Sequence, residues 1–336
     1  MRSTRSAPLR TWAIVLAGGD GVRLRSLARR VCGDERPKQY VPLLGDRTLL
    51  RQTLDRVARE IPASQTVVVV TQNHAMYLAR SARAVGDCAL LVQPANRGTA
   101  AGILLPVHWI FRQDPDATVA IFPSDHFVRD EARFMAQVAR VAAWIGVHRD
   151  RIVLLGAKPS RAEVEYGWIE RGVALEGPGD PPFSEVRRFW EKPTPERAQA
   201  CLESECLWNT FVIVAKARTI LGLAREAVPE IEQRLARLER FFGTEEGDRA
   251  LHRAYARMPS ANFSRAVLEP CATALAVAEL ADVGWADLGS PSRVLEILAR
   301  TPCRPRWAVG LDLAGLPAGS ATPPAAIACD ARPANA

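Results

Sequence analysis

The sequence has little of what marks thiol-stabilised, membrane-embedded or nucleic-acid-binding proteins. Its seven cysteines are irregularly spaced and form no Cys-x-x-Cys pair, which argues against a zinc site and a disulfide framework. No apolar run approaches the roughly 20 residues of a membrane-spanning helix, and the run after the N-terminal arginines is too short for a signal peptide. Aromatic residues make up only 7% of the chain, and no basic run alternates with aromatics that could stack on bases. We therefore expect a soluble cytoplasmic protein with no membrane or nucleic-acid partner.

The charge balance is mildly basic. The chain has 44 Lys and Arg against 37 Asp and Glu, a net charge of +7, and the arginines are scattered. A modest positive field of this kind suits small phosphorylated ligands. With 336 residues, of which 48% are hydrophobic, the chain can form one large domain or two small ones around a buried core.

Short apolar runs alternate with amphipathic segments along the first half of the chain. The apolar runs predict buried strands, and apolar spacing near 3.6 in the intervening segments predicts helices. The expected strands are 12–18, 66–71, 88–93, 117–125 and 151–156, and the expected helices are 47–60, 73–84, 98–113 and 130–148. This alternation predicts a Rossmann-like α/β fold, a mostly parallel sheet flanked by helices. Ligands of such sheets bind beyond the carboxyl ends of the strands.

The pattern changes after about residue 157. The sequence there predicts strands at 163–172, 183–193, 207–217 and 271–280, a short helix near 194–204, and helices within 217–257. From Thr301 onward Ala and Pro dominate, and large apolar residues are few. We therefore expect an N-terminal tail at 1–10, one domain at 11–300 with halves at 11–157 and 158–300, and a flexible tail at 301–336.

Glycines dominate the turn after the first expected strand. Gly18, Gly19 and Gly21 have no Cβ atom, so the backbone can approach a ligand and direct N–H groups at phosphates. Arg23 is placed to reach back over this loop, and Lys38, in the segment RPKQY, supplies a second cation. The pattern is neither a Walker loop nor Gly-x-Gly-x-x-Gly. Taken alone, the pattern is consistent with a phosphate-binding loop. It is equally consistent with a tight strand-to-helix turn followed by a solvated arginine.

The order of the motifs resembles the sugar-phosphate nucleotidyltransferase family. LAGG-x-G-x-RL followed by PKQ is the signature of that family, and the resemblance covers about residues 12–298. Further segments agree in the same order: QPANRGTAAGI (93–103), FPSDH (122–126), YGWIE (166–170), FWEKP (189–193), WNTFVIVAKA (208–217) and VGWADLGS (283–290). PKQ, YGWIE and VGWADLGS are most similar to the branch that transfers guanylyl groups to mannose 1-phosphate.

This resemblance implies a fold of the nucleotide-diphospho-sugar transferase type. Residues 11–157 would form the nucleotide half, and 158–300 a β-containing sugar-phosphate half. The implied reaction converts GTP and mannose 1-phosphate into GDP-mannose and pyrophosphate. We expect no second enzymatic domain, and a homodimer is left open.

Two carboxylates fit a Mg²⁺ site. Asp125 ends an apolar strand, at the edge where a parallel sheet presents its ligands, and Asp287 lies in the polar break WADLGS. Two carboxylates with phosphate oxygens and water suit Mg²⁺, and the resemblance implies this role. For Asp287 the alternative is a helix cap, although Ser290 before Pro291 is the better cap.

The resemblance also assigns roles to residues whose local pattern leaves alternatives open. Arg23, Lys38 and Lys192 would be the catalytic cations, the first two on the triphosphate and Lys192 on the sugar phosphate. The nucleotide would be lined by Ala17, Gly18, Gly19, Gly21, Gln93, Gly98 and Thr99, and the sugar phosphate by Gly167, Glu191, Lys192 and Asn209. Taken alone, Glu191 with Lys192 could equally form a surface ion pair, and Asn209 could be a turn residue.

Three departures from the family pattern bear on specificity. The guanylyl branch usually has Asn-Thr-Ala where this chain has Gly98-Thr99-Ala100, a version that also occurs among uridylyl- and thymidylyltransferases. Ser264 and Arg265 replace the usual Asp and Tyr, and the segment before Pro37 is longer. The alternatives are therefore a uridylyl- or thymidylyltransferase acting on glucose 1-phosphate, or a non-catalytic sugar-nucleotide sensor. His126 adjoins Asp125, and we expect it to support the site indirectly.

Overall fold

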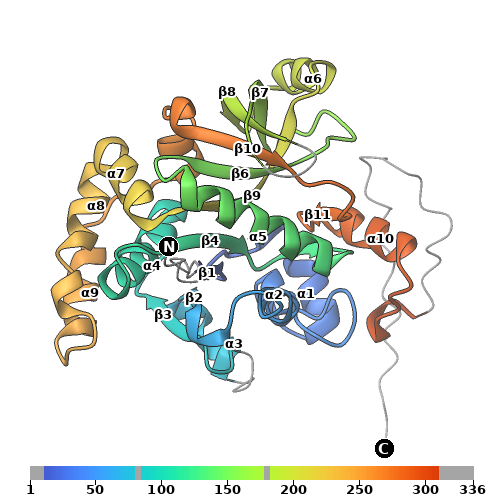
Figure 1. Ribbon diagram of the computed structural model, residues 1–336. Helices are drawn as coiled ribbons and strands as arrows, with labels where there is room; N and C mark the ends of the chain where they lie inside the picture. The colour runs from blue at the N-terminus through green and yellow to red at the C-terminus, as the bar shows by residue number, and fades with distance from the viewer. Residues whose placement is uncertain (1–10, 80–84, 178–181, 310–336) are drawn as a thin grey trace, which may run out of the picture.

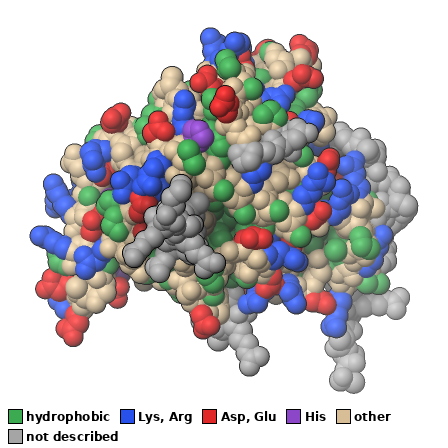
Figure 2. All heavy atoms as spheres, in the orientation of Figure 1, with side chains coloured by type: hydrophobic (Ala, Val, Ile, Leu, Met, Phe, Trp, Pro, Cys, Tyr) green, Lys and Arg blue, Asp and Glu red, His purple; other side chains and the backbone are tan. Residues whose placement is uncertain are grey.

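The structure is a computed structural model that describes residues 11–79, 85–177 and 182–309 (Figure 1). The expected tail at 1–10 and most of the expected tail at 301–336 lie outside the described residues. No helix formed by the described residues is long and apolar enough to cross a membrane. On the face shown in Figure 2, Lys and Arg side chains are interspersed with Asp and Glu side chains.

A nine-stranded sheet forms the centre of the molecule, in the order β3-β2-β1-β4-β9-β6-β10-β8-β7. Its first four strands run parallel and match four of the expected apolar runs. They are β1 (Thr11–Leu16), β2 (Thr66–Thr71), β3 (Ala89–Gln93) and β4 (Thr118–Pro123). This part of the sheet is the parallel, helix-flanked arrangement that the sequence predicts.

The rest of the sheet is mixed, so the expectation of a mostly parallel sheet is wrong for this half. The strand β9 (Leu207–Lys216) runs antiparallel between β4 and β6 (Ile152–Ala157). Then β10 (Leu275–Glu279) runs parallel to β6, and β8 (Phe183–Glu191) and β7 (Gly167–Leu175) pair antiparallel at the far edge. Because β9 is covered on both faces, its apolar sequence looks like that of a parallel strand and does not reveal its direction.

Helices cover both faces of the sheet (Figure 1). Alternate residues of β1 separate into two cores, with Trp12 and Ile14 on one face and Ala13 and Val15 on the other. The first core contains residues of α4 (Gly98–Gln113), α7 (Ala217–Ala227), α8 (Pro229–Ala236) and α9 (Gly247–Ala256). The second contains residues of α2 (Leu49–Val57), α3 (Ala75–Ala79) and α5 (Glu131–Val147).

Several expected helix starts have the caps that their sequences favour. The side chain of Thr48 caps α2, Asp130 caps α5, and Thr194 caps α6 (Pro195–Glu203). Ser290 caps α10 (Pro291–Arg300), which leaves Asp287 free of that role.

The C-terminal helix returns to the N-terminal loops. Residues of α10 share a small core with α1 (Arg25–Cys32) and with the segment before α2. Beyond α10, Ala308 is buried, and the indole N–H of Trp307 donates to the Leu43 carbonyl at 3.2 Å. Packed residues therefore continue past Thr301, where the sequence suggests a flexible tail.

Candidate active site

A cavity of about 530 Å³ opens where β1 and β4 end, and we call it the main cavity. Among the residues that line it are nine that the sequence singles out: Gly19, Gly21, Arg23, Lys38, Thr99, Asp125, Glu191, Lys192 and Asp287. The carboxyl ends of the parallel strands thus bring together cations and carboxylates that are far apart in the sequence.

Asp125 and Asp287 meet through a small two-stranded sheet. The strand β5 (His126–Val128) pairs antiparallel with β11 (Trp285–Asp287), and Asp287 lies opposite His126. Lys38 lies between the two carboxylates, with its Nζ 3.2 Å from Asp125 Oδ2 and 2.9 Å from Asp287 Oδ1. The ammonium also donates to the Leu288 carbonyl at 3.2 Å. Both carboxylates therefore approach one cation position.

Charge compensation keeps this cluster ionised although it is buried. Burial opposes ionisation of Asp287, but the neighbouring positive groups, Lys38 first, together outweigh it, and the pKa of Asp287 falls to about 2. Burial likewise opposes the charge of Lys38, but Asp125 and Asp287 raise the pKa of this lysine. At neutral pH the lysine is therefore a cation and Asp287 an anion.

This donor set fits a divalent metal. Asp125 and Asp287 place carboxylate oxygens around a common cation position, and oxygen ligands are what Mg²⁺ prefers. Within the described part of the chain, no cluster of three or more His, Cys, Asp or Glu side chains has metal-binding geometry. A metal held here would therefore draw its remaining ligands from substrate phosphates and water.

His126 adjoins both carboxylates. Its Nε2 lies 3.6 Å from Asp125 Oδ1 and 3.8 Å from Asp287 Oδ1. Its Nδ1 accepts a hydrogen bond from the Trp285 indole at 3.3 Å. Burial lowers the pKa of His126 despite the nearby carboxylates, so the neutral ring can support the two carboxylates through its remaining N–H.

The glycine loop is held by the PKQ segment. Gly21 has φ +57°, and a Cβ there would lie 2.9 Å from the Lys38 backbone nitrogen, so only glycine fits. Gln39 Nε2 donates to the carbonyls of Ala17 and Gly19 at 2.9 and 2.8 Å, and the Tyr40 hydroxyl donates to Ala17 at 2.8 Å. Ala17 itself lies beneath the loop and lines no cavity described here. The sequence gives no local sign of these roles for Gln39 and Tyr40.

Two cations of the main cavity share one carboxylate. Glu165, in the loop before β7, has its Oε2 3.1 Å from Arg23 Nη1 and 3.5 Å from Lys192 Nζ. Lys192 has φ +52°, a conformation that costs energy for a non-glycine residue. No local motif marks Glu165, because its partners are distant in sequence.

Glu191, at the end of β8, lines the main cavity together with the glycine loop. A Cβ on Gly167 would lie 3.1 Å from both Glu191 Oε2 and Asn209 Cβ, so this glycine lets the three strands approach closely. Gly167 and Asn209 do not themselves line the main cavity. Asn262, which the sequence does not single out, lines this cavity and lies 3.4 Å from Glu191 Oε1. Burial raises the pKa of Glu191.

A second cavity of about 320 Å³, the side cavity, adjoins the main cavity and is lined by Gly18, Gln93 and Gly98. Both cavities share Gly19, Thr99 and Asn262. The helix α4 begins here, but the Gly98 N–H already binds Asn96 Oδ1 at 3.0 Å and the Ala100 N–H binds the Ala261 carbonyl at 3.0 Å. The Thr99 hydroxyl accepts from the Phe263 N–H at 2.8 Å. The N–H groups of Gly98 and Ala100 are therefore not free for a ligand, although the first N–H groups of a helix generally lack partners within the helix.

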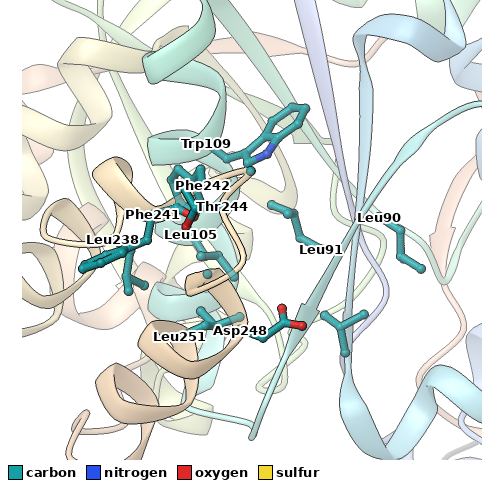
Figure 3. Close-up of a pocket in the computed structure, with 13 residues that line it drawn as sticks. Leu90, Leu91, Leu105, Trp109, Leu238, Phe241, Phe242, Thr244, Asp248 and Leu251 are labelled. Carbon is teal, nitrogen blue, oxygen red and sulfur yellow. The ribbon is translucent and has the colours of Figure 1, made fainter.

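A third cavity, of about 330 Å³, lies between β3, α4 and α9 and is lined mainly by apolar side chains such as Leu91, Trp109 and Phe241 (Figure 3). Asp248 is the one charged residue among the described residues that line it. Without a cation it does not match a phosphate-binding site.

The fold and the site have the features of an enzyme that handles phosphorylated nucleotides: a glycine loop, converging cations and paired carboxylates at the ends of parallel strands. Comparison with known proteins supports the same class of enzyme. Residues 12–302 match the family described as "Nucleotidyl transferase", and the chain belongs to this family of enzymes. The resemblance drawn from the sequence is therefore confirmed.

Two curated relatives show how similar the chain is to individual proteins. The chain is 34% identical over 289 residues to the xanthan biosynthesis protein XanB of Xanthomonas campestris pv. campestris, covering 84% of this chain and 58% of that protein. It is 31% identical over 304 residues to a mannose-1-phosphate guanylyltransferase of Escherichia coli K12, covering 88% of this chain and 61% of that protein. The chain thus spans about 60% of the length of these relatives.

A solved structure shares the fold. A protein from Thermus thermophilus, named mannose-1-phosphate geranyltransferase, superposes with a TM-score of 0.73 at 28% identity. The match covers 88% of this chain and 81% of that one. The expected nucleotide-sugar transferase fold is therefore present, with the mixed sheet described above.

Proposed function

We propose that this chain transfers a guanylyl group from GTP to mannose 1-phosphate, releasing pyrophosphate and forming GDP-mannose. The observation that carries the proposal is the convergence of Arg23, Lys38, Lys192 and two ionised carboxylates on one cavity. The names of the Escherichia coli and Thermus thermophilus relatives support mannose 1-phosphate as the acceptor.

The reaction is an in-line displacement at phosphorus. An oxygen of mannose 1-phosphate bonds to the α-phosphorus of GTP, and the bond from that phosphorus to the pyrophosphate oxygen breaks. The sugar phosphate is already an anion at neutral pH, so no general base is needed. The obstacle is repulsion between two polyanions, about 4 kcal/mol for two unit charges 4 Å apart at an effective dielectric constant near 20.

The residues of the main cavity offset this repulsion. Arg23 and Lys38 bind the triphosphate, and Lys192 binds the sugar phosphate beside Glu191, which accepts hydrogen bonds from sugar hydroxyls. Binding requires Arg23 and Lys192 to release Glu165, and Lys38 to exchange part of its contact with the carboxylates for a phosphate oxygen. Positioning both substrates in line supplies much of the remaining rate enhancement.

Asp125 and Asp287 would hold the divalent metal, which enzymes of this family generally use. We propose Mg²⁺, because two carboxylates with phosphate oxygens and water match its preference. When bound, Mg²⁺ supplies positive charge to the phosphate oxygens.

The side cavity is the proposed nucleobase site. Gln93 reads the base, and Gly98 with Thr99 shapes the wall next to it. The presence of glycine at position 98 favours a second candidate, a uridylyl- or thymidylyltransferase acting on glucose 1-phosphate, since that branch shares the glycine.

Pyrophosphate release, measured with each of four nucleoside triphosphates and with mannose or glucose 1-phosphate, tests the proposal. We expect the fastest release with GTP and mannose 1-phosphate. Faster release with UTP or dTTP would move the chain to the second candidate. No release with any pair, despite nucleotide binding, would indicate a non-catalytic sensor.

A further inference from the structure

The side cavity contains one buried amide with an unused donor. Gln93 ends β3 and is 4% exposed, and its side chain lies in the wall of the side cavity. Its Nε2 has no hydrogen-bond partner among the residues that the structure describes, although its Oε1 has one. Nε2 is not among the described side-chain atoms that are buried without a partner, so it is accessible from the side cavity and can donate to a ligand there.

The backbone beside this amide is open. A Cβ on Gly18 would lie 3.3 Å from Gln93 Nε2, and one on Gly102 would lie 3.7 Å from it. Gly18 and Gly102 thus leave room for a flat ring next to the Gln93 amide, and another glycine of this cavity, Gly98, keeps the adjoining wall close to Ala261.

The orientation of the amide is set from α9. The Tyr255 hydroxyl donates to Gln93 Oε1 at 3.1 Å, across 162 positions of sequence. Tyr255 is 1% exposed, and burial raises the pKa of its hydroxyl, so the hydroxyl keeps its proton at neutral pH.

Turning the amide over would leave the phenol without an acceptor. Gln93 is the hydrogen-bond partner of the Tyr255 hydroxyl within the described residues. With the amide reversed, Nε2 would face the phenol oxygen, and the buried O–H of Tyr255 would lose its acceptor. The hydrogen bond therefore holds the Gln93 N–H toward the cavity.

We propose that Tyr255 is a positioning residue for nucleobase specificity. By fixing Gln93 as a donor, Tyr255 makes the side cavity select bases that present a ring carbonyl, such as guanine or hypoxanthine, over adenine, which presents an amino group at the same position. The proposal rests on the proposed function only in placing the nucleobase in the side cavity. A donor facing an amino group leaves both groups unpaired, whereas a donor facing a carbonyl satisfies both.

ITP and ATP give the cleanest comparison, because neither has an amino group at position 2 and they differ at position 6 and in the protonation of N1. Dissociation constants for both nucleotides are measured by calorimetry on the unmodified protein, Tyr255→Phe, Gln93→Met and the double variant. We expect ITP to bind the unmodified protein about tenfold more tightly than ATP, and this ratio to fall below about threefold in Tyr255→Phe. In the Gln93→Met background, Tyr255→Phe should change the ratio no further, because the amide it orients is absent.

Tyr166→Phe is the matched control. Tyr166 is also buried, and its hydroxyl accepts from Arg293 at 2.7 Å, away from Gln93. This variant should keep the unmodified ITP to ATP ratio. An unchanged ratio in Tyr255→Phe, or an equal fall in both Tyr→Phe variants, would overturn the positioning role while the proposed transfer reaction could still be measured with GTP. No binding of either nucleotide to the unmodified protein would instead contradict the proposed function itself.

Discussion

The carboxylate of Glu165 pairs with Arg23 at 3.1 Å, although 142 positions separate the two residues in the sequence. The same oxygen lies 3.5 Å from Lys192 Nζ, so Glu165 pairs with two of the three cations that we propose bind phosphate in the main cavity. Substrate phosphates must therefore compete with a carboxylate of the protein.

Glu165→Gln should strengthen substrate binding modestly. All three side chains are about half exposed, so each ion pair contributes less than about 1 kcal/mol. We expect KM to fall about two- to fivefold for each substrate, with kcat nearly unchanged, in steady-state titrations of GTP and of mannose 1-phosphate. Glu170→Gln, which removes a neighbouring carboxylate paired with Arg187, is the control. A rise in both KM values would show that Glu165 supports binding.

Asp125→Asn and Asp287→Asn should each lower kcat by about 100-fold or more, because each removes a carboxylate from the proposed metal site. Circular dichroism should show an intact fold. Asp282→Asn, whose side chain is 81% exposed and pairs with Arg133, should keep the unmodified rate. Retention of more than about a tenth of the activity by Asp287→Asn would contradict the two-carboxylate site.

Glu191→Gln should stabilise the protein at neutral pH. Burial raises the pKa of Glu191 above that of the unfolded chain, about 4.3, so ionisation at higher pH costs folding free energy. The variant should therefore raise Tm by about 1–3 °C at pH 7.5, and the gain should vanish at about pH 3, well below the pKa of the unfolded chain, where the carboxyl is protonated in both states. Glu185→Gln, on the same strand β8, is the control. A stabilisation that does not depend on pH would contradict the role of the charge.

Gly98→Ala should destabilise the protein strongly. Gly98 has φ +78°, and a Cβ there would lie 2.3 Å from the Ala261 carbonyl oxygen. Gly243 has the same φ, with no heavy atom within 4 Å of its Cβ position. In urea unfolding we expect Gly243→Ala to cost about 1–2 kcal/mol and Gly98→Ala at least about 2 kcal/mol more. Equal costs would mean that the segment around Ala261 moves aside freely.

Local patterns in the sequence predict most elements of the fold. The helix expected at 98–113 has these bounds, and the one expected at 130–148 is α5, at 131–147. The apolar spacing of both helices, and the Asp130 cap of α5, are contained in a few neighbouring positions. The antiparallel course of β9 depends on which strands it inserts between, and no local pattern contains that information.

The candidate site likewise contains some residues that local motifs reveal and others that only long-range contacts reveal. Arg23, Lys38 and Asp125 lie in recognisable motifs and line the main cavity. Glu165 and Tyr255 become important only through partners 142 and 162 positions away. Such contacts exist only once the sheet and α9 have assembled, so one sequence by itself does not reveal them.

The most direct test of the account is the ratio of kcat/KM for GTP to that for UTP, measured by pyrophosphate release at saturating mannose 1-phosphate and Mg²⁺. Guanine presents an N2 donor beside an O6 acceptor, and a site built for these groups leaves polar groups unpaired around a pyrimidine, at about 1–3 kcal/mol each. The account predicts a ratio of about ten or more in favour of GTP. Equal or faster turnover of UTP would contradict it.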